Sequence, residues 1–488
     1  MQITRRGVLA GSLALGVTVP AWAREVRRPA RRPVSLSGSL RTEDLLAAIP
    51  AGAATGYVVL DMRTGAVLDA LGETQWLPPA SVQKSITTLF ALERLGARRQ
   101  LPTRVLGAGV LSAGVLRGDL ILQGGGDPTL DTDGLGDLVA SLARKGLRRI
   151  TGRFLVDASA LPALQRIAAD QPEQAGYNPG LAGLQLNFNR VNFEWGKGAS
   201  ALAMNARGER YLAPVHVATM AAVNRDSPLF ARTDRDGIEA WSVAAPALRK
   251  DGSRWLPVRH VGAYVADVFR GLCAAQGITL PDPEMTDRVA GASVLAERQS
   301  PALDVILKGM LKYSTNVTAE TLGLMASGAA DLAASAAAMG HWAEAHLGLH
   351  ARFVDHSGLG SEARVTPLGL ARAQRAGDAT PSGAALRGLL KSGGLKDDAG
   401  EALPGDPVTI RVKSGTLNFV SGLAGFIEVK GGRDLVFAIQ TADLQRRAAL
   451  PMESRENPPG LRNWLGLTRR LQGGLIRRWA DEFGKVEL

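Results

Sequence analysis

Apolar and polar positions alternate along the chain in a pattern that separates β-rich stretches from helical ones. Two short β runs flank the turn-forming residues 61–65, which predicts a hairpin, and three more runs at hairpin spacing occupy residues 408–442. Short β runs also fill much of residues 101–157, around one helix predicted near residues 135–145. Apolar residues at helical spacing predict further helices over residues 86–95, 260–276, 303–325 (broken near 312–314), 329–346, 365–376 and 461–479.

The N-terminal segment has the pattern of an export signal. A short basic start precedes a modest apolar run and the small-residue sequence Ala21-Trp22-Ala23. The pair Arg5-Arg6 favours a twin-arginine signal over a general secretory one. We therefore predict a signal peptide over residues 1–23, cleaved near Ala23, and a flexible lead-in over residues 24–40, which are rich in arginine and proline.

Composition narrows the class of protein. The 488 residues are 45% hydrophobic and 21% charged, which is typical of globular domains. The chain has one cysteine, Cys273, so an intrachain disulfide is impossible and a bacterial periplasm fits better than a disulfide-rich extracellular module. A formal charge of +11 suits anionic surfaces such as lipid head groups or cell-wall polymers, whereas nucleic acid is not expected outside the cytoplasm.

Ser81 and Lys84 lie where an extended Pro78-Pro79 approach turns into the helix predicted over residues 86–95. Their spacing places both side chains on one helical face, about a turn apart. A partly desolvated lysine can take the proton of a serine hydroxyl and make it a nucleophile. The alternative is a capping serine followed by a surface lysine.

Two further fragments supply partners for such a serine. The first is Lys312-Tyr313-Ser314-Thr315-Asn316, at the break between two predicted helices, with a hydroxyl for proton relay and an amide that can hold a peptide. The second is Lys413-Ser414-Gly415-Thr416, on the first of the late strands, with a cation, two hydroxyls and a glycine that allows close backbone approach.

In this order the three fragments resemble the S-x-x-K, S-x-N and K-T-G motifs of penicillin-binding proteins and β-lactamases. More than two hundred positions separate Ser81 from Ser314, as in the class C low-molecular-mass penicillin-binding proteins, the D-alanyl-D-alanine carboxypeptidase/endopeptidase family. Further similar segments are Gly118-Asp119-Leu120, Gly124-Gly125-Gly126-Asp127-Pro128-Thr129-Leu130, Ala319-Glu320, Asp355-His356-Ser357-Gly358-Leu359 and Lys413-Ser414-Gly415-Thr416-Leu417.

The resemblance implies catalytic roles for three residues. Ser81 would attack the carbonyl of a D-Ala-D-Ala-like bond and form an acyl-enzyme, with Lys84 as general base. Ser314 would relay a proton to the leaving amine. Whether Lys84 acts alone or shares the base role with Ser314 stays open.

It also implies a substrate-binding set. Asn316 would bind the substrate backbone, and Lys413 would keep the site electropositive and lower the pKa of Lys84. Ser414 and Thr416 would bind a substrate carboxylate beside Gly415, and the N–H groups of Ser81 and Thr416 would form the oxyanion hole.

The fold implied is α/β (α+β): a transpeptidase/β-lactamase-like domain with an antiparallel sheet flanked by helices. We expect residues 41–100 plus 295–488 to form it. Residues 101–175 plus 256–294 would be a β-rich insertion domain, and residues 176–255 a second, nested one.

Two positions depart from the family pattern. Ser414 replaces a threonine and keeps a hydroxyl, while His356 replaces a glycine, so the loop there is expected to differ. The spacing of His341, His346 and His350 does not match a zinc motif, and we expect no metal or cofactor.

These residues predict a penicillin-sensitive DD-peptidase of the periplasm that acts on peptidoglycan stem peptides, with β-lactam antibiotics as acylating inhibitors. One alternative is a β-lactamase or esterase on the same scaffold, although no E-x-x-L-N stretch is present. Another is a non-catalytic wall-binding relative, against which intact Ser81 and Lys84 argue. The basic C-terminal helix, residues 461–479, is either packed on the domain or in peripheral contact with a membrane.

Overall fold

A computed structural model describes residues 41–396, 403 and 407–484, so the predicted signal peptide and lead-in lie outside the described residues. Within this part the strongly periodic segments form helices close to their predicted positions, and the helix predicted over 303–325 is broken at Ser314. The α-helices are α1 Thr42–Ala47, α2 Lys84–Leu95, α3 Thr132–Arg144, α4 Val261–Ala275, α5 Leu303–Tyr313, α6 Asn316–Ser327, α7 Leu332–Leu347, α8 Pro367–Asp378, α9 Leu386–Leu389, α10 Leu444–Ala448 and α11 Leu461–Glu482.

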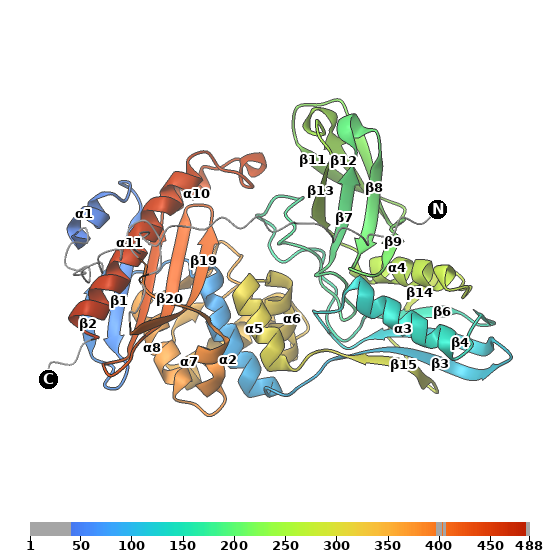
Figure 1. Cartoon of the computed structure of the whole chain (residues 1–488), viewed down its shortest axis with the longest axis horizontal. Helices are drawn as coiled ribbons and strands as arrows, with labels where there is room; N and C mark the ends of the chain where they lie inside the picture. Colours follow the sequence, from blue (N-terminus) through green and yellow to red (C-terminus); the bar gives the residue numbers. More distant parts are fainter. Residues whose placement is uncertain (1–40, 397–402, 404–406, 485–488) are drawn as a thin grey trace, which may run out of the picture. The chain divides into compact units, whose positions relative to one another are not determined.

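Both ends of the chain build one six-stranded antiparallel sheet (Figure 1). Its order is β18 (Lys391–Gly393), β19 (Val408–Leu417), β20 (Val420–Val429), β21 (Leu435–Ala442), β1 (Ala54–Asp61) and β2 (Val67–Leu71). The pairing of β1 with β21 places Tyr57 opposite Ile439. The predicted fold class, an antiparallel sheet flanked by helices, is confirmed.

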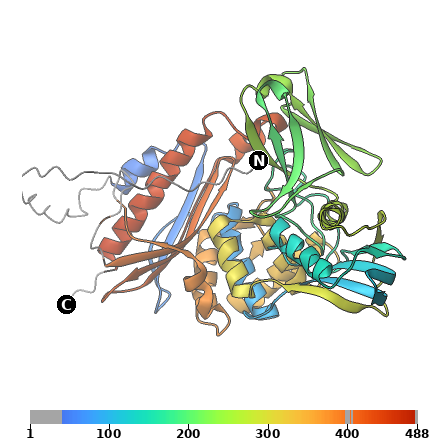
Figure 2. The ribbon, with the colours of Figure 1, turned by 45° about the vertical axis from the view of Figure 1, so that its right-hand side comes forward.

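Helices cover both faces of this sheet (Figure 2). On one face α2 contributes Ile86 and Phe90 to a buried cluster with Val58 of β1 and Phe426 of β20. On the other face lies α11, whose Trp479 packs against Tyr57 and Phe437 with ring centroids 5.8 Å apart in each pair. Burial of apolar area on both faces is the main source of stability for such a sheet.

The apolar stripe of α11 is therefore an internal surface. Of its members, Leu465 is partly buried, and the others are buried: Trp464, Leu471, Leu475, Ile476 and Trp479. Packing on the domain is the alternative that the structure supports, and a membrane-facing role for this stripe is wrong. Peripheral contact through another surface stays a prediction.

Residues 102–299 form three more sheets, and a two-stranded sheet lies later in the chain. The first is β14 (Pro283–Thr286), β6 (Phe154–Asp157), β4 (Val115–Gly124), β3 (Pro102–Ser112) and β15 (Ser293–Gln299), with β5 (Arg149–Ile150) beside β4. The second is β13 (Gly252–Pro257), β7 (Arg190–Trp195), β8 (Leu202–Arg207) and β9 (Leu212–Pro214). The third is β10 (Ala218–Val223), β12 (Ile238–Ala244) and β11 (Phe230–Arg235), and β16 (Ala351–Arg352) pairs with β17 (Arg364–Val365) farther along.

One buried cluster runs through the three insertion sheets and helices α3 and α4. It joins Phe154, Phe193, Trp241 and Phe269, which belong to both predicted insertions. The nested segment thus shares its core with the outer one, and the exact domain borders stay predictions. Among the described helices none alone is long and apolar enough to cross a membrane, and only the bent pair α6 and α7 reaches that length and composition jointly.

Candidate active site

Ser81 lies on a 3₁₀ turn, Ala80–Gln83, that leads directly into α2. Ala80 adopts φ +47°, a conformation that is costly for a residue with a side chain and that concentrates at functional sites. Two glycines make room for this turn. A Cβ on Gly415 would lie 2.8 Å from the Ser81 nitrogen, and one on Gly358 would lie 1.9 Å from the Ala80 oxygen. The turn is therefore held between strand β19 and the loop around residue 358.

Lys84 is fully buried directly beneath the serine. Its Nζ lies 2.9 Å from Ser81 Oγ, 2.8 Å from Asn316 Oδ1 and 2.8 Å from the Ser357 carbonyl oxygen. Burial first, and the charge of Lys413 second, hold the pKa of Lys84 well below its ordinary value. A neutral amine has two N–H donors, which match the two carbonyl acceptors, and one lone pair, which is left for the Ser81 hydroxyl.

Lys413 is the second buried lysine of the site. Its Nζ donates to Ser314 Oγ at 3.0 Å and to the Ser414 carbonyl oxygen at 2.6 Å. Burial lowers its pKa to about 8, so most of the population is charged at neutral pH. Ser314 ends α5 in the left-handed conformation, with φ +59°, which turns its hydroxyl toward this lysine. The break between α5 and α6 thus provides a hydrogen-bond acceptor for each lysine: Ser314 for Lys413 and Asn316 for Lys84.

The three predicted motifs meet at one cavity of about 270 Å³. Ser81, Ser314, Asn316 and Thr416 line it, Lys84 and Lys413 lie below it, and Gly415 packs against the Ser81 nitrogen. Ser414 is the exception. Its side chain is exposed and is not among the lining residues, so only its carbonyl contacts the catalytic groups. The roles assigned to these residues stay predictions.

A pair of buried carboxylates fixes the loop that carries the Ser357 carbonyl. Glu320 accepts from the His356 and Ser357 amides at 2.8 and 2.9 Å. Asp355 accepts from the Gly358 amide at 2.7 Å and from the Gly360 amide at 2.6 Å. Because the two carboxylates fix the amide groups of this loop, its carbonyl groups point in a fixed direction.

Those carbonyls face helix α2. Gln83 donates to the Asp355 carbonyl, Thr87 Oγ1 donates to the His356 carbonyl at 2.6 Å, and Lys84 contacts the next carbonyl, that of Ser357. The loop therefore connects the two carboxylates to Lys84 through peptide groups.

Sequence reasoning gave no role to this pair of carboxylates. Burial and the neighbouring Asp355 raise the pKa of Glu320 to about 8, and burial raises the pKa of Asp355. A charge on either carboxylate acts on Lys84 in the opposite direction to Lys413, because an anion favours the ammonium form. A signal was present: Glu320 follows Asn316 by one helical turn within an otherwise largely apolar run.

His356, which departs from the family pattern, has an ordinary negative φ, so the glycine expected at this position is not required by the backbone. Its buried ring lies 2.7 Å from Ser335 Oγ through Nε2 and stacks on Phe90 at 6.4 Å. Space for the ring comes from Gly323 of α6, where a Cβ would lie 2.1 Å from His356 Cγ. The backbone at this position thus needs no glycine, and Gly323 leaves the space that the His356 ring fills.

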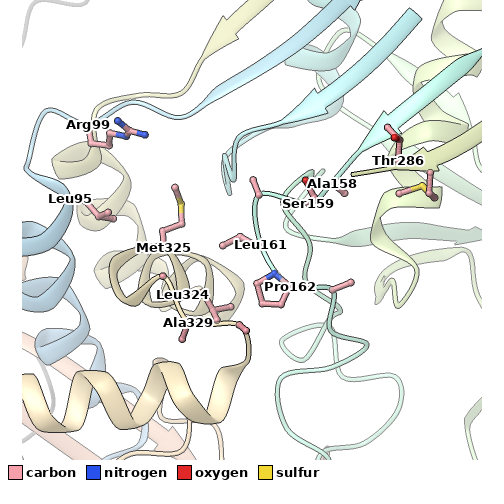
Figure 3. Close-up of a pocket in the computed structure, with 15 residues that line it drawn as sticks. Leu95, Arg99, Ala158, Ser159, Leu161, Pro162, Thr286, Leu324, Met325 and Ala329 are labelled. Carbon is pink, nitrogen blue, oxygen red and sulfur yellow. The ribbon is translucent and has the colours of Figure 1, made fainter. Parts of the chain in front are cut away.

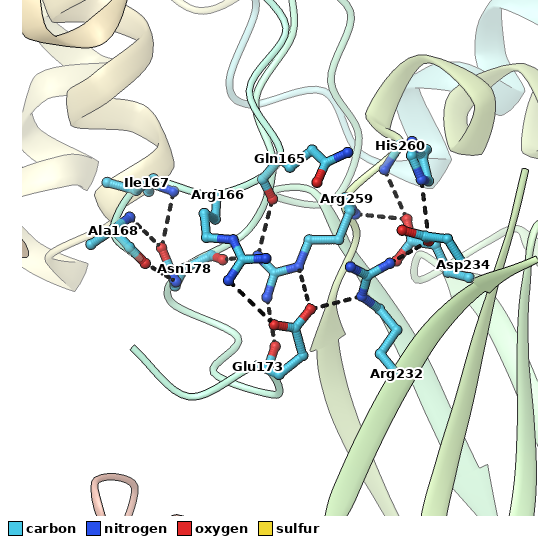
Figure 4. Close-up of polar contacts among 11 residues, drawn as sticks. Gln165, Arg166, Ile167, Ala168, Glu173, Asn178, Arg232, Asp234, Arg259 and His260 are labelled. Atoms are coloured by element: carbon cyan, nitrogen blue, oxygen red, sulfur yellow. Dashed lines mark hydrogen bonds and ion pairs between the residues drawn. The ribbon is translucent and has the colours of Figure 1, made fainter. Parts of the chain in front are cut away.

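A segment of the insertion, residues 164–181, closes on itself through the pairing of Leu164 with Leu181. We call it the strap. The buried guanidinium of Arg259 donates to the carbonyls of Gln165, Glu173 and Asn178 inside it (Figure 4). The geometry of the strap therefore depends on one arginine from the end of β13.

The strap reaches the catalytic cavity. The Tyr177 carbonyl accepts from Asn316 Nδ2 at 2.9 Å, and the Tyr177 hydroxyl donates to Gln171 Oε1 at 3.1 Å. Both strap residues line the cavity with Ser81. No motif or spacing pointed to them, because the contacts that bring them here are long-range.

A cavity larger than the one beside Ser81, of about 720 Å³, lies elsewhere. It separates α6 from the segment after β6, with Leu161 and Pro162 facing Leu324 and Met325 (Figure 3). None of the motif residues lines it, so size alone would have pointed away from the chemistry.

Comparisons with known proteins identify a family for the chain. The model of the D-Ala-D-Ala carboxypeptidase 3 (S13) family matches residues 40–455. The D-alanyl-D-alanine carboxypeptidase of Actinomadura sp. is 28% identical over 292 residues, which are 56% of this chain and 53% of that protein. Carboxypeptidase DacB of Mycolicibacterium smegmatis is 29% identical over 438 residues, which are 84% of this chain and 80% of that protein.

Among solved structures, penicillin binding protein 4 from Haemophilus influenzae has a similar fold. The TM-score is 0.71 at 19% identity, over 92% of this chain and 100% of that one. This match concerns the fold, whereas the match of the family model covers all three motifs. The match to the Actinomadura relative spans only about half of that protein's length. The chain belongs to the D-Ala-D-Ala carboxypeptidase 3 (S13) family.

Proposed function

We propose that the chain is a serine DD-peptidase, a D-Ala-D-Ala carboxypeptidase or DD-endopeptidase that cleaves peptidoglycan stem peptides. The observation that carries the proposal is the environment of Lys84. Its Nζ is buried 2.9 Å from Ser81 Oγ, and both of its N–H donors are matched by carbonyl acceptors. A buried, neutral lysine in this position is a general base beside a nucleophile.

In acylation the Ser81 oxygen attacks the carbonyl carbon of the scissile amide while its proton passes to Lys84 Nζ. The resulting oxyanion lies against the N–H groups of Ser81 and Thr416, which the close approach of Gly415 brings together. The C–N bond then breaks. The leaving nitrogen takes the proton of the Ser314 hydroxyl, and the proton that Lys84 removed from Ser81 returns to Ser314, so that Lys84 is neutral again while Lys413, 3.0 Å from Ser314 Oγ, keeps its charge.

Lys413 supplies the positive charge for a substrate carboxylate at the β19 side of the cavity, and Thr416 lines that side. Asn316 holds the substrate backbone at the other side. Deacylation reverses the first step: water loses a proton to the neutral Lys84, adds to the ester carbonyl, and Ser81 Oγ leaves with a proton. β-Lactams would acylate Ser81 by the same attack, and their opened ring would hinder the water step.

The test is labelling of the purified protein with a fluorescent penicillin, beside Ser81→Ala. We expect stable labelling of the parent and none of the variant. Absence of label on the parent, or equal label on both, would refute the proposal. Rapid release of the label would favour the β-lactamase alternative.

Export to the periplasm, where this substrate is found, is part of the proposal. It rests on the sequence of residues 1–23 alone. Substitution of both Arg5 and Arg6 by lysine should retain the chain in the cytoplasm if a twin-arginine signal is used. Cell fractionation with penicillin labelling measures this, and unchanged export would favour a general secretory signal.

A further inference from the structure

The three peptide groups that join residues 355 to 358 are each held at both ends. Their carbonyl oxygens accept from three side chains of α2, those of Gln83, Thr87 and Lys84. Their N–H groups donate to two buried carboxylates, those of Glu320 and Asp355. A trans peptide group is planar and points its N–H and its C=O in opposite directions, so an acceptor on one side fixes where the other side points.

The peptide group that contacts Lys84 is the one between Ser357 and Gly358. Its carbonyl oxygen lies 2.8 Å from Lys84 Nζ, and its N–H donates to Asp355 Oδ1 at 2.7 Å. The two bonds to Glu320 come from the two preceding peptide groups, at 2.8 and 2.9 Å. Of the two carboxylates, Asp355 is therefore the one bonded to the peptide group that faces the lysine.

The turn that Asp355 closes is built into the loop. Its other oxygen, Oδ2, accepts from the Gly360 amide at 2.6 Å. Gly358 adopts φ +75°, a left-handed conformation that favours glycine, and aspartate side chains commonly accept from nearby backbone amides in turns. Burial raises the pKa of Asp355, and the hydrogen bonds from the Gly360 and Gly358 amides oppose that rise. The direction of the Ser357 carbonyl is thus set by bonds within the loop.

This direction decides which part of the Lys84 amine faces Ser81. A neutral amine carries two N–H donors and one lone pair. Asn316 Oδ1, at 2.8 Å, accepts one N–H, and the Ser357 carbonyl accepts the other. Without the second acceptor, rotation about the Cε–Nζ bond would allow the second N–H to point at Ser81 Oγ. A donor in that position cannot take the proton of the hydroxyl.

We propose that Asp355 is a positioning residue for Lys84: through the Gly358 amide it directs the Ser357 carbonyl oxygen onto the amine, so that the lone pair faces Ser81. The inference rests on the proposed function, in which Lys84 takes the proton of the Ser81 hydroxyl. Asp355 touches neither the hydroxyl nor the cavity, so it acts only through the loop and through its charge.

The charge of Asp355 has a separate effect. An anion here favours the ammonium form of Lys84, as does one on Glu320, whereas Lys413 favours the neutral amine. Replacement of Asp355 by a neutral residue should therefore lower the pKa of Lys84 further, although it slows the proton transfer. A general loosening of the structure would slow the reaction without this shift.

The experiment measures acylation by a fluorescent penicillin over a range of concentrations, which separates the dissociation constant of the first complex from the limiting rate. Asp355→Ala removes the acceptor of the Gly358 amide, so the limiting rate should fall about a hundredfold. Asp355→Asn keeps one acceptor oxygen and should lose about tenfold. The dissociation constant should stay near the parent value in both, because Asp355 does not line the catalytic cavity.

The pH dependence of the limiting rate is the second measurement. In both Asp355 variants the acid limb should move to lower pH, because the anion that favours the Lys84 ammonium form is gone. Asp61→Asn is the matched control. Asp61 is buried and accepts from the Thr64 amide at 2.7 Å, three residues on, as Asp355 does from Gly358, but it does not line the catalytic cavity. Its rate and its acid limb should match the parent.

Equal losses in the two Asp355 variants, a loss of binding in place of rate, or an acid limb that stays in place would overturn the positioning role. If Asp355→Ala does not fold, Asp355→Asn decides, and an unchanged limiting rate in it would overturn the role as well. The two proposals fail separately. A parent protein that takes no label refutes the DD-peptidase, whereas a labelled parent with unaffected Asp355 variants refutes only the role of Asp355.

Discussion

The surroundings of the two buried lysines of the site differ in how strongly they favour the neutral amine. Lys84 has only carbonyl oxygens and the Ser81 hydroxyl around its Nζ, and its pKa is held well below its ordinary value by burial and by Lys413. Lys413, whose pKa is lowered by burial alone to about 8, is mostly charged at neutral pH. One lysine can therefore act as the base while the other supplies charge.

A bell-shaped pH profile of acylation should result. Below the depressed pKa of Lys84 its amine becomes charged and the rate falls, and above about pH 8 Lys413 loses its proton and the rate falls again. Lys413→Arg keeps the charge at high pH, so it should move the alkaline limb upward. The rate of labelling by a fluorescent penicillin from about pH 5 to about pH 10 measures this. With Lys430→Arg as control, an unmoved alkaline limb would exclude Lys413 as its source.

At the scale of elements, the residues of the candidate active site are positioned by packing and hydrogen bonds between segments that are far apart in sequence. Helix α6 supplies Glu320 to the loop after β16 and leaves room for His356 through Gly323. The strap crosses from the insertion to Asn316. Each fit is specific enough to be tested by substitution.

The packing of α6 against the loop predicts that substitutions at Gly323 and His356 have coupled effects on stability. Gly323→Ala places a Cβ 2.1 Å from His356 Cγ and should reduce the free energy of unfolding by about 1–3 kcal/mol. In a His356→Gly background the same alanine should cost less, with a coupling of about 0.5–3 kcal/mol. Denaturant unfolding of the four proteins measures it. Gly309→Ala in α5, where a Cβ meets nothing within 4 Å, is the control and should be neutral or stabilising. Strict additivity would contradict the described packing.

The strap predicts an effect at a distance. Arg259→Gln removes donors from the carbonyls of Gln165, Glu173 and Asn178, so amides of residues 164–181 should exchange hydrogen faster. Penicillin acylation should slow as Tyr177 loses its position beside Asn316.

The control for the strap is Arg166→Gln. Arg166 pairs with Glu173 at 3.5 Å but is partly exposed, and such a pair contributes little. Exchange and acylation should both stay near the parent values in this protein. Equal effects of the two substitutions would show that the strap is not organised by Arg259.

On the scale of the whole molecule, periodicity and motif order were sufficient for much of the architecture. The hairpin at residues 61–65, the break at Ser314 and the three late strands were predicted, because each depends on local pattern. The meeting of the motifs was also predicted, but only through the family resemblance.

The remaining features depend on contacts that no local pattern encodes. The left-handed Ala80 and the strap contact of Tyr177 each arise where distant segments meet. The exposed side chain of Ser414 is a similar case, since strand geometry rather than motif spelling decides where it points. The motifs thus identified the groups proposed to react and missed the groups that contact and position them.

Two separate buried clusters, one in the six-stranded sheet and one in the insertion, predict separable unfolding. Trp479→Ala removes the ring between Tyr57 and Phe437 and the bond from its Nε1 to Asp69 Oδ2 at 2.7 Å. A loss of about 3–5 kcal/mol is expected, confined to the part of the chain that forms the six-stranded sheet and its helices. Calorimetry should show a lower Tm for the transition that penicillin shifts, with the other unchanged. Trp76→Ala, at an exposed position, is the control.

Because β1 pairs with β21, the six-stranded sheet cannot be completed during synthesis until β21 has been made. Ser81 leaves the ribosome more than three hundred residues before Lys413 and before β21, the strand that pairs with β1. A nascent chain with its nucleophile complete thus lacks both its second lysine and the neighbour strand that closes the sheet. If the proposed function holds, a translation product that stops before β19 lacks groups that the reaction needs.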